Sequence, residues 1–585
     1  MKHLVSLLSS ATLALLVSGH ALAQDVAYVT CSDGTVQQYA VSSLNNVTFS
    51  ADGTYIYLQT TDAVLITYPV AAVNSIEFVQ PAGSAPQAID ETFDVLMDAA
   101  DDQLYTEVKE TIPTSETSTN DYGDFVENFE EDEESKGTVT ITYGTSTVEV
   151  TYQPTSLKGK AVAVQSGSAT DVVVYGNKKV DYVLKGQCDN GSFTLYSAKK
   201  STITLDGLTL KNDAGAALTM PKKVAGSVEY GGKTAYIVLK SGTVNTLEDG
   251  SSYSSTIAGE DMKGAIFSEG QLIFSGNGTL NVKSNYGHGI ASDDYIRVRG
   301  NSAKYAHCPV INIHSAKDGI STNDYFLMYG GRITIDAADD GIDVGKGHVD
   351  IRGGWLTVNS VDEGVMASYE GEADGSYDSS ITPNVNVAGG VLKITTTGSK
   401  GMAIKAAKDV NVSNGVVQAT VKGAGSKAVN ADGNVILSGG KITAMVEGIP
   451  VYDEEDDDVS SAAGIRTKGT LTLGGATVGI KATAEGGKGI NSVGSVQMNG
   501  GTLSVVAMSG KYSSGGHSSR ARGVTADGGI SVAGGVLRVR TLDDAVYVPE
   551  AATVSLTAGA LHAFSTDGKA LAGTVAQTGG WLVTR

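Results

Sequence analysis

Carboxylates recur immediately before glycine at a nearly constant interval in the middle of the chain. Asp318, Asp340 and Glu363 each precede a glycine, and these glycines lie 22 and 23 residues apart. Asp339 and Asp362 stand directly before two of the acids. If each interval is one turn of a stacked β structure, the three acids form a column with a spacing of about 5 Å. Like charges at that spacing repel by about 1 kcal/mol in water, and by several-fold more in a partly buried site.

Such a column suits Ca²⁺, which takes about six to eight oxygen ligands in adaptable geometry. The sequence therefore predicts a calcium site at these acids. The alternative is that Asp-Gly is only a favourable turn dipeptide whose carboxylate faces water. A second group of oxygen ligands is predicted at the next corner of the turns, with ordinary Asx turns as its alternative: Asp293, Asp294, Asn323, Asp324 and Asp343.

Cationic and aromatic side chains near these acids could contact a ligand. Four arginines alternate with apolar residues and are expected to point outward: Arg297, Arg299, Arg332 and Arg352. With Lys346 on a nearby corner and with Ca²⁺, they could bind the carboxylates of uronate sugars, or they could only balance local acids. Trp355 follows a Gly-Gly pair and is expected to project outward. Its exposed indole would lie flat on a sugar ring, and the alternative is shielding by a loop or by the N-terminal module.

The elements that must position these residues are short strands. Each interval contains three apolar stretches separated by Gly, Asp or Asn, and apolar and polar residues alternate within them. One coil of this kind cannot bury its inward side chains or pair its edge N–H and C=O groups, but stacked coils do both. The period predicts an all-β fold, a right-handed parallel β-helix. Its expected inward residues are Ile320, Ile333, Ile335, Ile342, Ile351, Leu356 and Val358.

Composition agrees with a solenoid and restricts the partners. The 585 residues include 73 glycines, which we expect at the corners of the coils, where positive φ is needed. The formal net charge of −22 argues against nucleic acid, because phosphate binding requires a basic face. An acidic protein can bind neutral glycans directly. An acidic glycan requires a local basic patch or bridging divalent cations.

The chain divides into four predicted regions. Residues 1–23 are typical of a cleavable signal peptide, with no lipobox cysteine after them, and no later stretch predicts a transmembrane helix. This indicates a secreted or cell-surface protein. Residues 24–80 form a small β module, and residues 81–136 form a linker with a helix-like stretch at 89–112 and an acidic run. Residues 137–585 form the β-helix.

Several segments resemble a family of secreted bacterial carbohydrate-binding β-helix proteins. The resemblance covers about residues 137–560 and is carried best by segments 244–250, 264–268, 285–294 and 337–342. It implies a pectate-lyase-like fold associated with calcium and acidic plant polysaccharide. His288 stands where related sequences often have an acid, which puts one metal ligand in doubt. The N-terminal module resembles short modules of exported Bacteroidetes proteins.

Three functions are consistent with these features. The first is a calcium-binding β-helix protein that binds a pectin- or polygalacturonate-like polysaccharide without cleaving it. The second is a calcium-dependent lyase of the pectate type, which needs only Ca²⁺ ligands and one Arg or Lys as base, here Arg297, Arg332 or Lys346. The third is a structural or adhesive solenoid. The chain contains neither HExxH nor GxSxG, and the sequence identifies no catalytic residue and no oligomeric state.

Overall fold

A computed structural model gives the structure of the protein. It describes residues 26–32, 36–40, 44–50, 54–60, 65–79, 92–95, 135–159, 162–166, 170–224, 227–229, 234–254, 257, 260–300, 309–372, 374–454 and 457–585. Strands dominate these residues, and the helical elements among them are two short 3-10 turns, η2 (Val70–Ala72) and η4 (Thr155–Leu157). The prediction of an all-β chain is therefore confirmed. The described segments include no helix that is long and apolar enough to cross a membrane.

Some predicted regions lie outside the described residues. They are the signal peptide at 1–23 and almost all of the 81–136 linker with its acidic run. Of the helix-like stretch at 89–112, the structure describes only residues 92–95, which are not helical. The chain consists of two compact units, Met1–Glu91 and Thr92–Arg585.

The first unit contains two small antiparallel sheets. One has the strand order β2-β1-β6, and the other has the order β3-β4-β5. Their buried centre includes Val29, Ile56 and Leu58. The strands are β1 (Val26–Cys31), β2 (Val36–Ala40), β3 (Leu44–Phe49), β4 (Tyr55–Thr60), β5 (Leu65–Pro69) and β6 (Val73–Val79).

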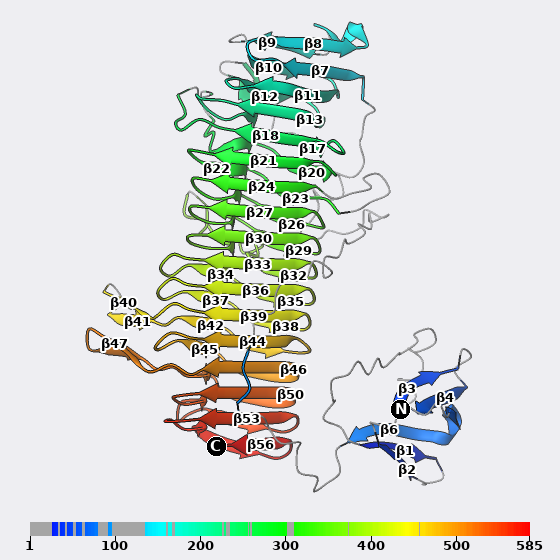
Figure 1. Cartoon of the computed structure of the whole chain (residues 1–585), viewed down its shortest axis with the longest axis vertical. Coiled ribbons are helices and arrows are strands. Elements are labelled where there is room, and N and C mark those ends of the chain that lie inside the picture. Colours follow the sequence, from blue (N-terminus) through cyan, green and yellow to red (C-terminus); the bar gives the residue numbers. More distant parts are fainter. Residues whose placement is uncertain are drawn as a thin grey trace. The chain divides into compact units, whose positions relative to one another are not determined.

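The second unit is a stack of coils, each made of three strands (Figure 1). A strand pairs in parallel with the equivalent strand of the next coil, for example β19 with β22, β20 with β23 and β21 with β24. Equivalent strands therefore form three ladders. The first ladder is β10 (Asp171–Gly176), β12 (Ser192–Ser197), β14 (Leu218–Met220), β19 (Gly264–Ser268), β22 (His288–Ser292), β25 (Ile320–Thr322), β28 (Ile342–Val344), β31 (Val365–Ala367), β34 (Met402–Ala406), β37 (Lys427–Ala431), β42 (Ala463–Thr467), β45 (Lys488–Ser492), β49 (Val524–Ala526), β51 (Val546–Tyr547) and β54 (Leu571–Ala572). At its start, β9 (Val162–Ser166) pairs with β10 in antiparallel fashion.

The second and third ladders belong to one large sheet. The second ladder is β17 (Ala235–Leu239), β20 (Leu272–Gly276), β23 (Ile296–Val298), β26 (Tyr325–Met328), β29 (His348–Ile351), β32 (Val385–Val387), β35 (Val410–Val412), β38 (Val435–Leu437), β43 (Leu471–Leu473), β52 (Thr553–Leu556) and β55 (Thr574–Gln577). The third ladder is β18 (Val244–Glu248), β21 (Thr279–Ser284), β24 (Val310–Ser315), β27 (Arg332–Ala337), β30 (Trp355–Ser360), β33 (Val391–Thr396), β36 (Val416–Val421), β39 (Lys441–Val446), β44 (Thr477–Ala482), β53 (Ala560–Ser565) and β56 (Trp581–Thr584).

A few strands depart from this pattern. Long strands contribute to the second and third ladders in succession: β11 (Asp181–Cys188), β13 (Ser201–Lys211), β46 (Val496–Ala507) and β50 (Ile530–Thr541). The first coil is bordered by β7 (Thr138–Tyr143), which pairs in antiparallel fashion with β8 (Val148–Gln153). Within the described part of the stack, three hairpins interrupt the coils: β15 (Lys223–Val224) with β16 (Ser227–Glu229), β40 (Val451–Asp453) with β41 (Asp458–Ser460), and β47 (Tyr512–Ser514) with β48 (His517–Ser519).

The interior of the coils is filled by the alternating apolar residues. All seven expected inward residues are buried in one continuous core, with exposures of 0 or 1%. The expected direction of the side chains in these strands is therefore confirmed. Burial of aliphatic side chains contributes about 1.5–3 kcal/mol each, and the repeated coils add such contributions along the whole stack.

Glycine is required at two places in the coil around β28 and β30 for different reasons. At the corner before the third ladder, Gly354 has φ of +90°, which L side chains rarely adopt. At the opening of the first ladder, Gly341 has no positive φ, but a Cβ there would lie 2.2 Å from Val358 Cγ1 and 2.4 Å from Gly364 O. Backbone conformation explains the corner glycine, as expected. Close packing between coils explains the opening glycine.

The core predicts the effect of a buried charge. Ile342→Asp places an unpaired carboxylate in the interior, and we expect a loss of more than about 3 kcal/mol in the free energy of unfolding, or failure to fold. The control is Thr334→Asp on the outward side of β27, which should change stability by less than about 1 kcal/mol. Urea denaturation measures both. Similar stabilities of the two variants would contradict the inward direction of Ile342.

Candidate functional site

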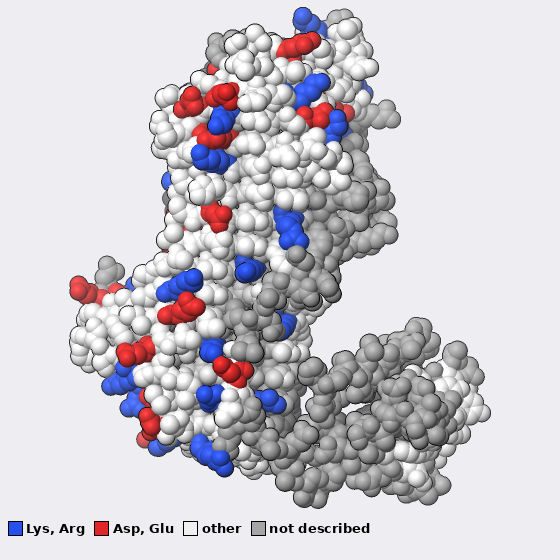
Figure 2. Space-filling view, in the orientation of Figure 1, with Lys and Arg blue, Asp and Glu red and all other residues white. Residues whose placement is uncertain are grey.

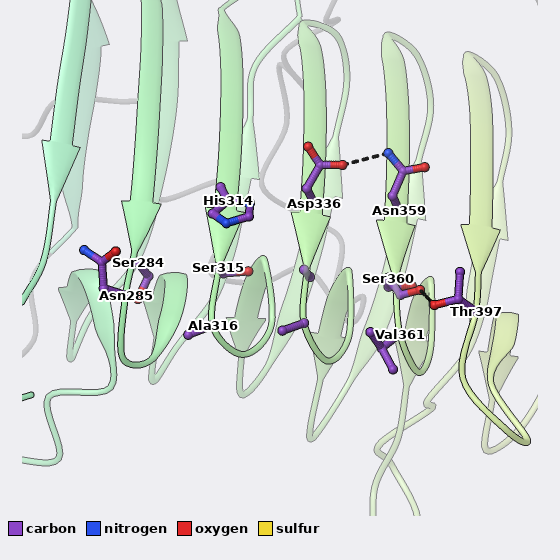
Figure 3. A pocket seen from close by; sticks show the side chains of 12 residues that line it. Ser284, Asn285, His314, Ser315, Ala316, Asp336, Asn359, Ser360, Val361 and Thr397 are labelled. Carbon is purple, nitrogen blue, oxygen red and sulfur yellow. Dashed lines mark hydrogen bonds between the residues drawn. The ribbon is translucent and has the colours of Figure 1, made fainter. Parts of the chain in front are cut away.

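A groove of about 480 Å³ runs across five coils at the ends of third-ladder strands (Figure 3). It begins at β21 and passes β24, β27 and β30 to the turn after β33. At about 4.8 Å per coil, its length is about 19 Å. The groove is lined by Ser284, Asn285, His314, Ser315, Ala316, Asp336, Ala337, Ala338, Asn359, Ser360, Val361 and Thr397.

Polar side chains stand in register along the groove. His314, Asp336 and Asn359 are exposed and occupy equivalent positions on successive strands. The Asn359 side-chain amide donates to Asp336 Oδ1 at 2.8 Å. The Ser360 hydroxyl oxygen is buried and has no hydrogen-bond partner among the described residues. Imidazole, carboxylate, amide and hydroxyl groups at one-coil spacing can donate to and accept from a row of hydroxyl groups.

An exposed aromatic residue adjoins one end of this groove in the sequence. Tyr286 follows the groove residue Asn285 and is 49% exposed. Its ring lies 4.9 Å from the ring of Tyr253, measured between centroids, which limits its orientation. A tyrosine in this position can pack an apolar ring face against a ligand while its hydroxyl remains in water. Sequence reasoning did not identify Tyr286 as a binding residue, although it lies within the 285–294 segment that carries the family resemblance.

The predicted carboxylate column lies directly after the groove residues. Backbone hydrogen bonds hold it in register: Gly319 N–H donates to Asp340 O at 2.9 Å, and Gly341 N–H donates to Glu363 O at 2.8 Å. Side chains reinforce the stack, because Glu363 N–H donates to Asp340 Oδ1 at 2.7 Å. The structure thus brings together the residues expected to share a column. The same contacts give the carboxylates a structural role.

Side-chain nitrogen groups of the described residues lie against only the two ends of the column. Asp318 Oδ2 lies 2.9 Å from His288 Nδ1, and Glu363 Oε1 lies 2.8 Å from Lys405 Nζ. Between them, Asp340 is 8% exposed. Burial, and next the charge of Glu363, raises the pKa of Asp340 to about 9. Burial and neighbouring acids also raise the pKa of Asp343 and of Asp362, each to about 6.

This cluster fits a divalent cation better than the whole column does. Asp339, Asp340 and Asp362 each offer an oxygen within 4.8 Å of the others. Asp343 Oδ1 is buried and has no hydrogen-bond partner among the described residues. Carboxylate oxygens at this density are the donors that Ca²⁺ prefers, and a bound cation would let the acids ionise. The contacts of Asp318 with His288 and of Glu363 with Lys405 make these two acids weaker candidates than the other three.

The second predicted group does not assemble as expected. Asp293 Oδ1 lies 2.6 Å from Lys263 Nζ. Asp294 accepts a hydrogen bond from the Gln271 side chain, and Asn323 is exposed. Asp324 donates its backbone N–H to Asp294 O at 3.1 Å. Asp343 lies on β28, where Asp318 and Glu363 act on its pKa.

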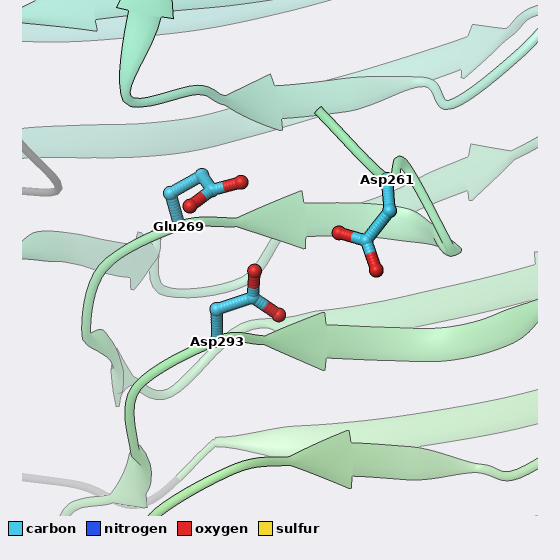
Figure 4. A group of neighbouring side chains, drawn as sticks. All are labelled: Asp261, Glu269 and Asp293. Carbon is cyan, nitrogen blue, oxygen red and sulfur yellow. The ribbon is translucent and has the colours of Figure 1, made fainter. Parts of the chain in front are cut away.

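Asp293 instead joins two acids that the sequence did not single out. Figure 4 shows its carboxylate facing those of Asp261 and Glu269, with oxygens within 4.8 Å of one another. Burial, and next Glu260, raises the pKa of Glu269 to about 8. Lys263, however, lies against Asp293 and supplies a cation of the protein's own. Asp261 lies before β19, outside the repeating acid-glycine pattern, so that pattern could not reveal it.

Three expected ligand-binding residues are inaccessible, which corrects the prediction. Arg297 is 0% exposed and Arg299 is 5% exposed, and their guanidinium groups lie over the rings of Tyr329 and Tyr236. Trp355 is 6% exposed rather than presenting a free indole. Its ring N–H donates to Thr357 Oγ1 at 3.0 Å. Alternation correctly places these side chains away from the coil interior, but it does not predict an additional buried layer outside the coil.

The other expected cations have protein partners. Arg332 lies over the Trp355 ring, 4.9 Å from its centroid. Arg352 forms two hydrogen bonds to Asp350 Oδ2, at 2.7 and 2.9 Å. Lys346 Nζ lies 2.7 Å from Glu372 Oε1. Arg352 and Lys346 therefore balance local acids, which was the alternative role expected for these basic residues.

Comparison with known proteins identifies the family. The model of a family described as carbohydrate-binding domain-containing protein matches residues 166–446, 382–508 and 467–570, which together cover more than half of the chain. The chain belongs to this carbohydrate-binding family. The groove and the carboxylate cluster both lie within the 166–446 match of the family model.

Other comparisons add little. A solved structure of a polysaccharide lyase-like protein from C. thermocellum, a gadolinium derivative, matches at 15% identity and a TM-score of 0.28. The match covers 61% of this chain and 96% of that chain. A TM-score this low supports no conclusion about the fold or the function of this member of the carbohydrate-binding family. A search of curated proteins found no match.

The buried carboxylates predict an unusual pH dependence without metal. The folded state holds a proton on Asp340 up to a pH of about 9, whereas an unfolded aspartate loses it near its ordinary pKa of 3.8. The free energy of unfolding should therefore fall as pH rises from about 4 to 9 in chelator. Asp340→Asn should remove part of this slope and raise stability at pH 8 by on the order of 1 kcal/mol.

Urea denaturation in chelator at pH 5 and pH 8 measures this effect. Asp336→Asn, at an exposed carboxylate on β27, is the control and should keep the wild-type slope. Equal slopes for wild type and Asp340→Asn would show that Asp340 is ionised in the folded protein without metal.

Proposed function

We propose that this protein binds polysaccharide in the groove between β21 and the turn after β33. The observation that carries the proposal is the row of polar side chains at one-coil spacing, with the exposed Tyr286 directly after Asn285 at one end of the row. Ring packing and hydrogen bonds to hydroxyl groups are the contacts that a glycan can make. Membership of a carbohydrate-binding family supports the same class of ligand.

The proposed ligand is an acidic glycan of the pectin or polygalacturonate type, bound with Ca²⁺. The residues that would hold the cation are Asp339, Asp340 and Asp362, beside the groove. When bound, Ca²⁺ would supply positive charge to both protein and uronate carboxylates. Figure 2 shows basic side chains among the acidic ones on one face of the protein. This mixture of charges supports the proposal that the protein can bind an acidic ligand. A bridging cation reconciles such a ligand with the formal charge of −22.

We also propose the type of β-helix and the cellular location that the sequence predicts. The three parallel ladders support a right-handed parallel β-helix of the pectate-lyase type. A binding groove on the outside of such a stack suits a secreted or cell-surface protein exported by a signal peptide. The parallel pairing places equivalent residues of successive coils on one line, which matches an extended repeating ligand better than a compact one.

The positions of the basic side chains support binding of the polysaccharide without cleavage. Of the three bases considered for a lyase, Arg297 is buried, Arg332 stacks on Trp355 and Lys346 pairs with Glu372. Each is engaged by other residues. Incubation with polygalacturonate and Ca²⁺ distinguishes the alternatives, because β-elimination creates an unsaturated product that absorbs in the ultraviolet. We expect no increase in absorbance.

Groove variants test the position of the ligand. Tyr286→Ala and Asp336→Ala should each weaken binding of polygalacturonate by roughly tenfold, about 1.4 kcal/mol, with little change in melting temperature because both side chains are exposed. Tyr377→Ala is the matched control, since Tyr377 is 62% exposed and does not line the groove. Isothermal titration calorimetry measures the affinities. A loss confined to Tyr377→Ala would move the site to the loop after β31.

Calcium titration tests the cation site. A ligand that binds only the folded state stabilises it by about 2.7 kcal/mol at a hundredfold excess over Kd, so Ca²⁺ should raise the melting temperature of the wild type. Asp362→Asn should reduce this increase, and Asp261→Asn should not, because Asp261 belongs to the other carboxylate cluster. The reverse result would place the cation there. Equal melting curves in Ca²⁺ and in chelator would remove the metal from the proposal.

A further inference from the structure

The third-ladder face beyond the groove carries basic residues and no acidic ones. From β33 to β53, the strands of this ladder contain five Lys or Arg residues and no Asp or Glu, in a protein with a formal net charge of −22. The five are exposed or partly exposed: Lys393, Lys441, Lys481, Arg538 and Arg540. We call the three on β44 and β50 the basic strip, which consists of Lys481, Arg538 and Arg540. Such a strip is the local basic patch that an acidic glycan requires.

The basic strip continues the row of polar side chains that forms the groove. Equivalent positions on successive third-ladder strands are, in order, Asp336, Asn359, Thr395, Thr420, Met445, Lys481, Val506 and Arg540. Lys481 lies three coil steps, about 14 Å, beyond β33, the last strand of the groove. A ligand that extends along the stack for several sugar units can therefore reach both the groove and the strip.

A short segment of the chain itself lies on the basic strip. Residues 92–95, which we call the strap, belong to the second unit and run across its third-ladder strands, where Figure 1 draws them as the blue line in front of β46 and β50. Lys481 Nζ donates to Asp94 Oδ2 at 2.6 Å. This hydrogen bond lowers the pKa of Asp94 below its ordinary value, so its carboxylate is ionised at neutral pH. The strip thus already binds one carboxylate.

The other contacts of the strap involve oxygen acceptors and a flat apolar surface. Arg540 Nη1 donates to the carbonyl oxygens of Thr92 and Phe93, at 2.9 and 2.7 Å. Val95 is buried against Gly479, where a Cβ would lie only 2.9 Å from Val95 Cγ1. An acidic polysaccharide offers the same three kinds of group, because it carries carboxylates, oxygen acceptors and the apolar faces of sugar rings.

The strap is held by few groups. Val95 is the one buried residue of its four. The side chains of Asp94 and Lys481 are 41% and 27% exposed, so water and salt weaken their ion pair. A polysaccharide bound in the groove would present its further carboxylates to the strip at high effective concentration. Such a ligand can compete with the strap.

We propose that the basic strip is a second binding site for the carboxylates of an acidic polysaccharide, and that the strap occupies this site until the polysaccharide displaces it. The inference rests on the proposed function and extends the binding surface along the row of the groove. Lys481 and Arg540 would contact uronate carboxylates directly, without the cation of the carboxylate cluster. The strap is then an internal competitor that weakens binding of short ligands more than binding of long ones.

The ion pair between strap and strip gives the first test, because its two members should have opposite effects. Asp94→Ala weakens the competitor and should tighten binding of polygalacturonate at least threefold in calorimetry. Lys481→Gln removes a cation that the polysaccharide would contact and should weaken binding at least threefold. The matched control is the surface pair of Asp206 and Lys240, 2.6 Å apart and outside the groove. Asp206→Ala and Lys240→Gln should each keep the wild-type affinity.

Each other result of this test has a definite meaning. Wild-type affinity in both Asp94→Ala and Lys481→Gln, with clear binding by the wild type, would overturn the second site and leave the proposed function intact. Weaker binding by both variants would show that the strap does not compete and would overturn its displacement. Binding that appears only in Asp94→Ala would support the strip and reject the groove. No binding by the wild type or by Asp94→Ala would reject the proposed function and the inference that rests on it.

Cleavage by chymotrypsin follows the strap directly. This protease cleaves after Phe93, whose carbonyl oxygen is held by Arg540. Saturating polygalacturonate should speed cleavage between Phe93 and Asp94 several-fold, as measured by mass spectrometry of the products. In Arg540→Gln this bond should be cleaved quickly with or without polysaccharide, which controls for effects on the protease. An unchanged or slower cleavage of the wild type on addition of polysaccharide would show that the strap stays bound and would overturn its displacement.

Discussion

Parallel hydrogen bonding between successive coils is the constraint on which the other features of this structure depend. Each coil can satisfy its backbone only by lying in register on its neighbour, so equivalent residues are placed one above another at about 4.8 Å. The inward members of each coil form the continuous core. The outward residues of successive coils form rows of side chains, and these rows can contact a ligand. Gly341 shows how tightly this register is held, because a Cβ there would overlap the next coil.

Because the coils are in register, charged side chains at one position of successive coils lie close together and their charges add. Where one position carries acids in successive coils, repulsion grows unless partners intervene, and His288 and Lys405 supply such partners only at the two ends. Asp340 remains between them, buried and with a raised pKa. This imbalance is of the kind that an external cation relieves, and an acidic glycan with Ca²⁺ provides one.

The repeat in the sequence was sufficient to predict the all-β character, the inward residues and the shared column of Asp318, Asp340 and Glu363, because all three follow from a period and an alternation. The period and the alternation do not predict how side chains pack on the outside of a coil. Alternation placed Arg297, Arg299 and Trp355 away from the interior, yet they are buried there. Asp261 lies outside the repeat, and the inserted β40–β41 hairpin lengthens the interval between β37 and β42. Groove residues such as Asp336 carry no motif, since each is simply an outward strand residue.

Hydrogen–deuterium exchange with and without polygalacturonate and Ca²⁺ tests the central claim most directly, that the stacked register forms a polysaccharide groove on the third-ladder side. Core strand amides are protected by the ladders in both states, so added protection should come from the turns that line the groove. We predict slower exchange in the segments around 285–287, 316–318, 338–340 and 361–363, which the groove or the carboxylate cluster includes. Protection confined to other turns of the coils, or none under conditions where binding is measured, would contradict this account.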